Sequence, residues 1–355
     1  MIGIRADANR EIGLGHIMRC LSIANALKAM DQEVCFILAD DSAAELLKGR
    51  GQEYHILNSA YNRMEEELAD LQGVLKERKI KLLLIDSYQV TEAYLIKLKS
   101  LVKTIYMDDI PKLAYPVDGI INYNIYGEDM PYQKLALKWA GNGKVEQQFW
   151  LGPAYAPLRE QFQGIDYKVR SIAENVLITT GGSDKYNLAG SILEAALTKD
   201  DIAEYARTLH YHVVSGVFNP HFPMLEEMAG KYPNIHLYQN VTNMAELMEK
   251  CDVAITAGGS TMYELCAVGV PIICFSFVDN QELIVENFYK KHLVAYGGNY
   301  LTEKEAFAGN VARALVTLIK DEKSRQEFSR KSRQLVDGQG AERIAAALCE
   351  NLEQN

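Results

Sequence analysis

Two glycines and a histidine close the turn after the first predicted strand of this 355-residue chain. Residues 1–6 fit a strand, and Gly13, Gly15 and His16 precede a helical pattern over 17–30. The glycines permit positive φ and let a ligand approach the backbone closely. His16 would lie at the helix N-terminus, where the positive end of the dipole disfavours an imidazolium. Because a neutral histidine can accept a proton near pH 7, His16 is the candidate general base.

Two other interpretations of this turn stay open. Gly13 and Gly15 match the first two positions of a dinucleotide-binding fingerprint, and Asp40 or Asp41 could imitate its ribose-binding acid. The third glycine of that fingerprint would fall at Met18, whose side chain would block the close packing of helix on strand. In the other interpretation the glycines only turn the chain, and His16 is a solvated cap of the helix.

Two further glycine turns lie in the second half of the chain. Residues 181–184, Gly-Gly-Ser-Asp, follow a strand expected over 175–180, and residues 258–261, Gly-Gly-Ser-Thr, follow one expected over 252–256. Each turn precedes a helical pattern, so each offers backbone N–H groups and a helix dipole to an anion. Neither contains the Gly-Lys-Ser/Thr of a Walker A loop, which disfavours triphosphate hydrolysis. Together the two turns could hold a diphosphate.

Polar residues near these turns could bind the rest of a nucleotide. Glu264 would lie one helical turn past Ser260 and could accept hydrogen bonds from two vicinal ribose hydroxyls, or it could be a solvated helix glutamate. Asn280 and Gln281 follow a strand expected over 271–275 and could reach a sugar or a base, or be ordinary loop amides. The predicted nucleotide-binding residues are Gly182, Ser183, Gly259, Ser260, Thr261, Glu264, Asn280 and Gln281.

The sequence predicts neither a metal site nor a cofactor. It contains no Asp-x-Asp, a motif that often holds a metal bridging a diphosphate, and His210-x-His212 has no supporting cysteine or carboxylate cluster. The six cysteines include no Cys-x-x-Cys, so we expect buried free thiols.

Strands alternate with helices along the whole chain, which is typical of βαβ units and parallel sheets. Prolines 153 and 157 indicate a hinge, because neither a helix nor a central strand continues through them. We therefore expect two α/β, Rossmann-like domains facing each other across a cleft. The first covers 1–152, the nucleotide-binding second covers 153–336, and segment 337–355 packs back on the first. Further strands are expected over 33–39, 82–86, 103–107, 119–122, 212–215 and 235–238, and further helices over 63–77, 188–197 and 262–268.

Charge and hydropathy exclude some classes of protein. Lys and Arg number 37 against 47 Asp and Glu, a net charge of −10, so we expect no sequence-independent binding of nucleic acid. Nowhere do 18 consecutive apolar residues occur, and residues 1–5 show no signal-peptide pattern. We expect a cytoplasmic protein without a membrane span. No heptad pattern demands assembly, so a monomer is expected.

Several motifs occur in an order that resembles a known family. They are residues 13–20 (Gly-Leu-Gly-His-Ile-Met-Arg-Cys), 151–159, 181–184, 257–264 and 337–343. Together they resemble the UDP-2,4-diacetamido-2,4,6-trideoxy-β-L-altropyranose hydrolase family of pseudaminic acid biosynthesis. That family is similar to the GT-B glycosyltransferase that adds N-acetylglucosamine to the peptidoglycan lipid precursor. The resemblance covers nearly the whole chain.

This resemblance implies a GT-B fold, with UDP held mainly by the second domain and the sugar facing the first. His16 matches the family's catalytic histidine, which activates water. The family tends to show Asp-His-Tyr where this chain has Asp86-Ser87-Tyr88, so that histidine is missing while Tyr88 remains available to substrate. Asp108, Asp109 and residues 122–124 match the family's sugar-side loops, although they could also be turn formers. The predicted substrate-binding residues are Arg10, Gly13, Gly15, Asp86, Tyr88 and Asn124.

The reaction implied is hydrolysis of a UDP-linked diacetamido-trideoxy-hexose at the bond between C1 and oxygen. Water would attack from the face opposite the diphosphate, so the anomeric configuration would invert. Two other functions stay open at this point. One is a GT-B glycosyltransferase that uses a UDP-sugar for a surface or spore-coat polysaccharide. The other is a non-catalytic nucleotide-sugar sensor. The stereochemistry of the sugar stays open too.

Overall fold

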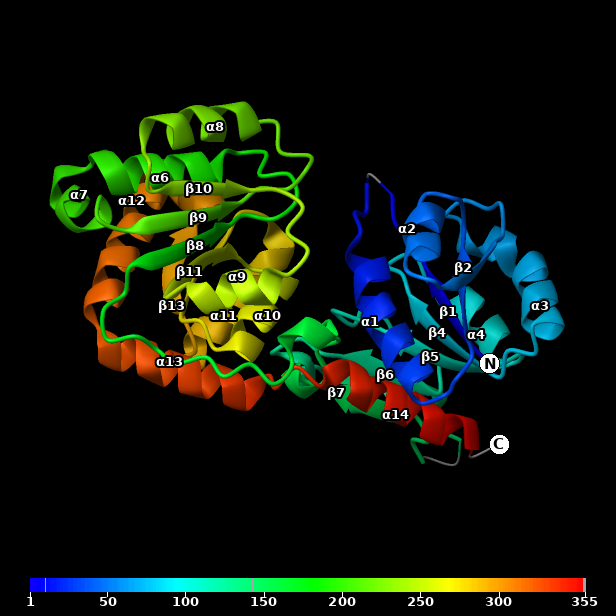
Figure 1. Ribbon diagram of the computed structural model, residues 1–355. Coiled ribbons are helices and arrows are strands. Elements are labelled where there is room, and N and C mark those ends of the chain that lie inside the picture. Colours follow the sequence, from blue (N-terminus) through cyan, green and yellow to red (C-terminus); the bar gives the residue numbers. More distant parts are fainter. Residues whose placement is uncertain (10, 142–143, 354–355) are drawn as a thin grey trace. The chain divides into compact units, whose positions relative to one another are not determined.

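The computed structural model of the protein describes residues 1–9, 11–141 and 144–353 (Figure 1). The chain divides into two compact units. The first unit consists of Met1–Glu160 and Gln339–Asn355, and the second of Gln161–Gly338. These boundaries lie slightly later in the chain than the expected ones at 152 and 336.

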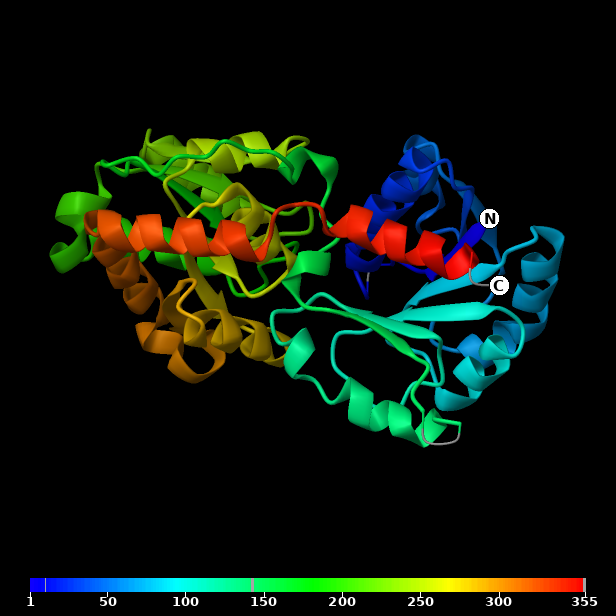
Figure 2. The ribbon, with the colours of Figure 1, turned by 90° about the horizontal axis from the view of Figure 1, so that it is seen from below.

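The first unit is built on a parallel seven-stranded sheet with the order β3-β2-β1-β4-β5-β6-β7. Helices cover both faces of the sheet (Figures 1 and 2). The strands are β1 (Ile2–Ala6), β2 (Val34–Leu38), β3 (Glu53–Ile56), β4 (Leu82–Asp86), β5 (Lys103–Met107), β6 (Gly119–Asn122) and β7 (Gln148–Leu151). The α-helices are α1 (Gly15–Ala29), α2 (Ala44–Gly49), α3 (Leu68–Glu77), α4 (Glu92–Lys99), α5 (Tyr132–Ala136) and α14 (Gly340–Glu353).

The second unit repeats this plan with a parallel six-stranded sheet of order β10-β9-β8-β11-β12-β13. Its strands are β8 (Asn175–Thr179), β9 (His210–Val214), β10 (Ile235–Tyr238), β11 (Val253–Ala257), β12 (Ile272–Ser276) and β13 (Ala295–Asn299). Its helices are α6 (Leu188–Thr198), α7 (Asp200–Ala206), α8 (Phe222–Lys231), α9 (Met244–Lys250), α10 (Ser260–Val268), α11 (Asp279–Lys290), α12 (Tyr300–Lys320) and α13 (Glu322–Leu335).

Each sheet has one point where the direction of winding reverses. In the first sheet this switch point lies between β1 and β4, which pair from Ile2 opposite Leu82 to Ala6 opposite Asp86. In the second sheet it lies between β8 and β11. Open α/β sheets bind their ligands at the carboxyl ends of the strands, at such a switch point.

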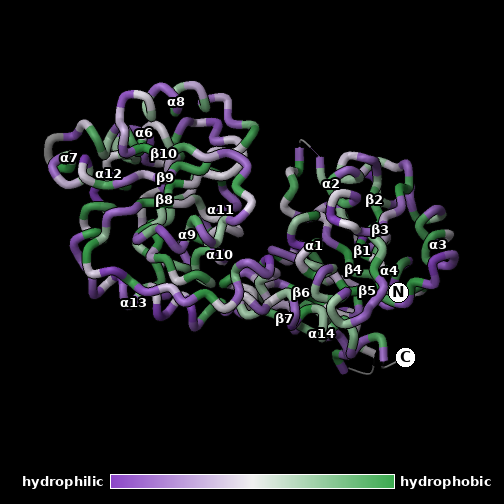
Figure 3. Tube along the Cα trace, in the orientation of Figure 1, coloured by the Kyte–Doolittle hydropathy of each residue, from purple (hydrophilic) through white to green (hydrophobic). Residues whose placement is uncertain are grey.

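The central strands form because their residues are almost all apolar. All five residues of β2, β4, β11 and β12 are buried, as expected for parallel strands covered by helices on both faces. Figure 3 shows hydrophobic segments inside each unit, with hydrophilic residues mostly on the helices and loops outside.

Most of the predicted elements are confirmed. The strands over 82–86, 103–107, 119–122 and 235–238 have the predicted bounds, and the other strands differ by one or two residues at their ends. The helix predicted over 63–77 begins instead with a 3-10 turn, Met64–Glu67, before α3. Sequence reasoning did not predict β3, β7 and β13. All three are edge strands, whose short and partly polar sequences resemble those of loops.

Candidate functional site

The glycine turn after β1 delivers His16 to the switch point of the first sheet. Gly13 has φ +72°, and the Asn9 side chain organises the turn by accepting from the backbone N–H groups of Glu11 and Ile12. Helix α1 begins at Gly15, so His16 lies in its first turn as predicted. The His16 residue is only 7% exposed. The interpretation of His16 as a solvated cap is therefore wrong.

Asp86 and Arg19 hold the His16 ring. His16 Nδ1 lies 2.6 Å from Asp86 Oδ1, and Arg19 grips the same carboxylate through Nε (2.6 Å to Oδ2) and Nη2 (2.5 Å to Oδ1). Arg19 lies three residues after His16, so both side chains leave the same face of α1. Asp86 ends β4, the strand next to β1, and its side chain is fully buried. Strand pairing and helix periodicity thus bring the three residues together.

The charge on Asp86 fixes the role of the imidazole. Burial would raise the pKa of this carboxyl, but the Arg19 guanidinium, and after it His16, hold that pKa well below its usual range. Because Asp86 is ionised, His16 Nδ1 carries a hydrogen that it donates to the carboxylate. In the neutral ring, Nε2 is then the proton acceptor. The expected contact between Asp86 and substrate does not fit its complete burial, and the geometry supports a positioning role instead.

Asp109, the second residue after β5, organises a second group of side chains beside His16. Its carboxylate accepts hydrogen bonds from the Tyr88 hydroxyl, from Asn124 Nδ2 (2.9 Å) and from Arg19 Nη1 (3.4 Å). The Tyr88 ring stands edge-on to His16 with the ring centroids 4.7 Å apart. Partial burial of the half-exposed side chain, and after it the Asp109 charge, raise the pKa of Tyr88, so its hydroxyl stays protonated and donates.

A buried carboxyl lies next to this group. Asp108 is 3% exposed and accepts from the hydroxyls of Tyr132 (2.6 Å) and Tyr115 (3.1 Å). Asn122 donates to the Tyr132 hydroxyl (2.7 Å) and to the backbone carbonyl of Asp109 (2.8 Å). Burial raises the pKa of Asp108 to about 6, although its hydrogen bonds oppose the shift. Asp108 therefore supports the loop that carries Asp109.

The first glycine turn of the second unit follows β8. Gly181 has φ +90°, which favours glycine, and residues 182 and 183 are exposed. Asp184 closes the turn by accepting from the backbone N–H groups of Leu188 (2.7 Å) and Ala189 (3.1 Å) at the start of α6. The backbone of Gly216 packs so tightly that a Cβ there would lie 2.0 Å from the carbonyl oxygen of Gly182. The turn is thus fixed from both sides while its outer surface stays open.

The second glycine turn follows β11, the neighbour of β8. Gly259 precedes α10, whose first residues are Ser260 and Thr261, and the space beside the Cα of Gly259 is open. Glu264, one turn along α10, is half-buried. Gly258 lies against α11, because a Cβ there would come within 2.7 Å of Val285. The backbone N–H groups at the start of α10 can therefore meet an anion at the carboxyl edge.

Asn280 and Gln281 belong to the first turn of α11, which follows β12, rather than to a loop. The Asn280 side chain is exposed. Gln281 Oε1 accepts from the backbone N–H of Phe277 at 3.0 Å and so stabilises the turn that leads into α11. Both residues lie at the carboxyl edge of a strand adjacent to β11.

The structure thus places the predicted residues in two groups, one in each unit. His16, Asp86 and Tyr88 lie together, Asn124 joins them through Asp109, and Gly13 and Gly15 form the turn before His16. Arg10 lies outside the described residues. The eight predicted nucleotide-binding residues follow β8, β11 and β12, which are adjacent. Sequence reasoning missed Arg19 as a member of the site, although helix spacing could have indicated it, and it named Asp109 only among the sugar-side loops.

His210 and His212 belong to a stack of rings on β9 and β10. The ring of His212 lies 5.0 Å from that of His236, and its nitrogens contact the Tyr238 hydroxyl (3.0 Å) and Asn175 Oδ1 (3.1 Å). Among the described residues, no three His, Cys, Asp or Glu side chains are grouped so that they could hold a metal ion. All six cysteines are free, and all but Cys349 are buried.

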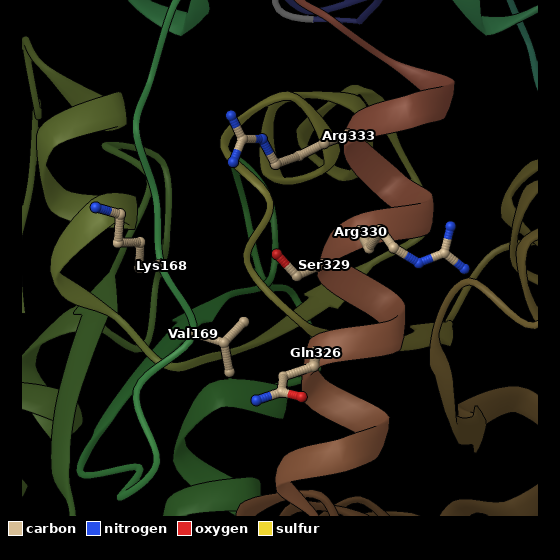
Figure 4. Close-up of a pocket in the computed structure, with 6 residues that line it drawn as sticks. All are labelled: Lys168, Val169, Gln326, Ser329, Arg330 and Arg333. Carbon is tan, nitrogen blue, oxygen red and sulfur yellow. The ribbon is translucent and has the colours of Figure 1, made fainter.

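A hollow of about 470 Å³ lies elsewhere on the second unit, between α13 and the segment that leads into β8 (Figure 4). Its lining residues are Lys168, Val169, Gln326, Ser329, Arg330 and Arg333. The Arg333 guanidinium donates to the backbone carbonyls of Ile165 and Tyr167, and Arg330 donates to Gln334. The hydrogen bonds of Arg330 and Arg333 thus stabilise the local fold. None of the predicted site residues lines the hollow.

Comparison with protein families gives a match to the glycosyltransferase family 28 C-terminal domain over residues 176–346. The match covers most of the second unit and the start of α14. The chain is 27% identical to the spore coat polysaccharide biosynthesis protein SpsG of Bacillus subtilis over 99% of both chains. It is also 27% identical to the UDP-2,4-diacetamido-2,4,6-trideoxy-beta-L-altropyranose hydrolase of Campylobacter jejuni, over 78% of this chain and 92% of that protein. The resemblance to this hydrolase family is confirmed.

An uncharacterized protein of Methanocaldococcus jannaschii, MJ1062, is similarly 27% identical over 82% of this chain. The chain spans only 58% of that relative's length.

Solved structures share the whole fold. MurG from Acinetobacter baumannii superposes with a TM-score of 0.65 at 12% identity, covering 98% of this chain and 99% of that one. UDP-GlcNAc 2-epimerase from Neisseria meningitidis superposes with a TM-score of 0.66 at 13% identity, covering 99% and 100%. The predicted GT-B fold is confirmed. Because proteins of different names share it, the GT-B fold alone does not fix the reaction. Within the described part of the chain, we find no helix with the length and apolarity that crossing a membrane requires.

Proposed function

We propose that this GT-B protein hydrolyses a UDP-linked diacetamido-trideoxy-hexose to free sugar and UDP, as a step of pseudaminic acid-type biosynthesis. The observation that carries the proposal is the buried contact between His16 and Asp86 at the switch point of the first sheet. The hydrolase from C. jejuni, to which 78% of this chain is similar, supports the choice of substrate.

In the proposed mechanism the nucleotide binds to the second unit. Backbone N–H groups of the two glycine turns and the positive end of the α10 dipole would hold the diphosphate without a cationic side chain. Glu264 would accept hydrogen bonds from the ribose hydroxyls, and Asn280 and Gln281 would contact the nucleoside. The same N–H groups would stabilise the charge that develops on the leaving diphosphate, a contribution that is often the largest in catalysis.

His16 would act on the water. As the oxygen of a water molecule forms a bond to C1, the bond from C1 to the diphosphate oxygen breaks, and its electron pair leaves with UDP. The water proton passes to His16 Nε2, and Asp86 stabilises the imidazolium that forms. General-base catalysis of this kind contributes roughly 10²–10⁴-fold. Because attack comes from the face opposite the leaving group, the sugar is released with inverted configuration at C1.

The decisive experiment follows UDP-linked diacetamido-trideoxy-hexoses by NMR in the presence of the purified protein and no acceptor. We expect one sugar nucleotide to disappear, with UDP and free sugar in equal amounts and the inverted anomer first. The His16→Ala variant should bind UDP with unchanged affinity but turn over at least a hundredfold more slowly. No turnover of any such sugar, or equal loss of UDP binding and turnover in His16→Ala, would contradict the proposal.

A second candidate function is transfer of the sugar to an acceptor. The similarity to the spore coat polysaccharide biosynthesis protein over 99% of both chains favours it, because that similarity covers more of the chain than the one to the hydrolase. His16 would then deprotonate an acceptor hydroxyl instead of water. Strict dependence of UDP release on an added acceptor would favour transfer over hydrolysis. Tight binding of a UDP-sugar with no turnover under either condition would indicate a non-catalytic sensor.

A further inference from the structure

The carboxylate of Asp109 joins four elements at the carboxyl edge of the first sheet. It follows β5 and accepts from Tyr88 in the loop after β4, from Asn124 in the loop after β6, and from Arg19 of α1. Its side chain is 19% exposed. Unlike the fully buried Asp86, Asp109 therefore lies where the polar groups of the site meet solvent.

Tyr88 depends on this carboxylate for its position. The Tyr88 residue is 48% exposed, so burial leaves much of its side chain unrestrained. Its hydroxyl nevertheless donates to Asp109 Oδ2, and its ring edge contacts His16. A half-exposed aromatic ring normally samples several rotamers, and a charge-assisted hydrogen bond at its far end selects one of them.

We infer that Asp109 is a positioning residue, which acts on the proposed reaction by holding the Tyr88 ring against His16. This inference rests on the proposed function, because it assumes that His16 Nε2 receives a proton. With Tyr88 in place, one side of the imidazole is shielded, and the water to be activated has fewer approaches to Nε2. Without Asp109 the Tyr88 ring turns into solvent, and the His16 ring loses both this shielding and the aromatic contact that packs against it.

The test is a double-mutant cycle between Asp109→Ala and Tyr88→Phe. Tyr88→Phe keeps the ring and removes only the hydroxyl that donates to Asp109. We expect each single variant to lower kcat about tenfold with little change in KM. The double variant should then lose far less than a hundredfold, because both changes remove the hydrogen bond between Tyr88 and Asp109. Asp70→Asn, which changes an exposed carboxylate on α3, is the matched control and should leave kcat unchanged.

A second measurement needs no substrate. The Tyr88 ring shifts the NMR resonances of the His16 ring protons by its ring current, and both Asp109→Ala and Tyr88→Phe should reduce this shift. Additive losses in kcat, or a His16 spectrum in Asp109→Ala identical to that of the unaltered protein, would overturn the inference. If the spectrum changes as expected while no UDP-sugar is hydrolysed, the contact stands and the proposed function fails. Unchanged melting temperatures would show that each variant is folded.

Discussion

The carboxyl edges of the two sheets have the same topology and opposite chemistry. In the first unit, charged and aromatic side chains surround one imidazole, and they range from the fully buried Asp86 to the half-exposed Tyr88. In the second unit the corresponding edge presents glycine turns and the start of α10, so backbone N–H groups are the donors. A general base needs a side chain that is unprotonated before the reaction and can take up a proton, whereas a diphosphate needs several donors at short range. In the proposed function, proton transfer therefore belongs to the first edge and diphosphate binding to the second.

The largest effect should come from breaking the first edge at Asp86. Asp86→Asn leaves the shape of the side chain but removes the negative charge that orients His16 and pairs with Arg19. An amide can donate to Nδ1 and so favour the tautomer with the hydrogen on Nε2, which cannot accept a proton. We expect kcat to fall by roughly 10³-fold, within the range of lost base catalysis, while UDP affinity stays unchanged. Steady-state kinetics and calorimetric titration with UDP measure the two quantities, and a parallel loss of UDP affinity would contradict the assignment.

Changes at the edge of the second sheet should weaken UDP binding more than they lower kcat. Gly216→Ala places a Cβ against the carbonyl of Gly182 and must displace the turn that follows β8. We expect UDP binding to weaken about tenfold, which corresponds to ~1.4 kcal/mol, with a smaller change in kcat. Gly230→Ala is the matched control, because a Cβ at this position in α8 meets no atom within 4 Å. Equal UDP affinity in the two variants would show that the 181–184 turn does not bind the nucleotide.

The units should also differ in how acid affects their stability. The pKa of Asp108 is raised to about 6 in the folded first unit, from an ordinary value of 3.8. Its contribution to stability is therefore fully present below pH 3.8 and is lost as the pH rises through 6. The loss is ~3 kcal/mol at most. Asp108→Asn should flatten this dependence, as measured by urea unfolding of both proteins between pH 4 and 7. An unchanged slope would show that Asp108 is not protonated in this range.

The smallest effect is expected at His212 in the second unit, with the opposite sign. Burial, and then the neighbouring His236, His210 and Lys250, lower the pKa of His212 from 6.5 to about 4. The contribution of His212 to stability is therefore fully present above pH 6.5. It is lost as the pH falls towards 4, because in this range only the unfolded chain binds the proton. His212→Gln should reduce this loss by a few tenths to ~2 kcal/mol, since the side chain is only partly buried. Hydrogen exchange of the β9 amides at pH 5 and 7 measures this loss of stability. An equal change in protection in the unaltered protein and in His212→Gln would refute the prediction.

Much of both edges could be predicted from sequence because glycine spacing and apolar runs are local signals. The turns before His16 and before α10 follow directly from strands whose residues are buried throughout. The network around Asp109 could not be predicted in this way. The partners of Asp109 come from two other loops and a helix, and the separation reaches 90 residues between Arg19 and Asp109, so only strand order brings them together. The edge strands β3 and β7 were missed for a related reason, since only pairing distinguishes them from loops.

The position of α14 has a consequence for biosynthesis. This helix buries Ile344, Ala345 and Leu348 and packs on α1 of the first unit. Lys103 Nζ of β5 also donates to the backbone carbonyl of Asn351 in α14 (2.7 Å). On the ribosome, however, α14 emerges only after the whole second unit has been synthesised. Until then, the nascent first unit exposes the apolar surface of α1 that α14 later covers. Holdase chaperones should therefore recognise this surface during translation, and a stalled chain lacking α14 should be their preferred client.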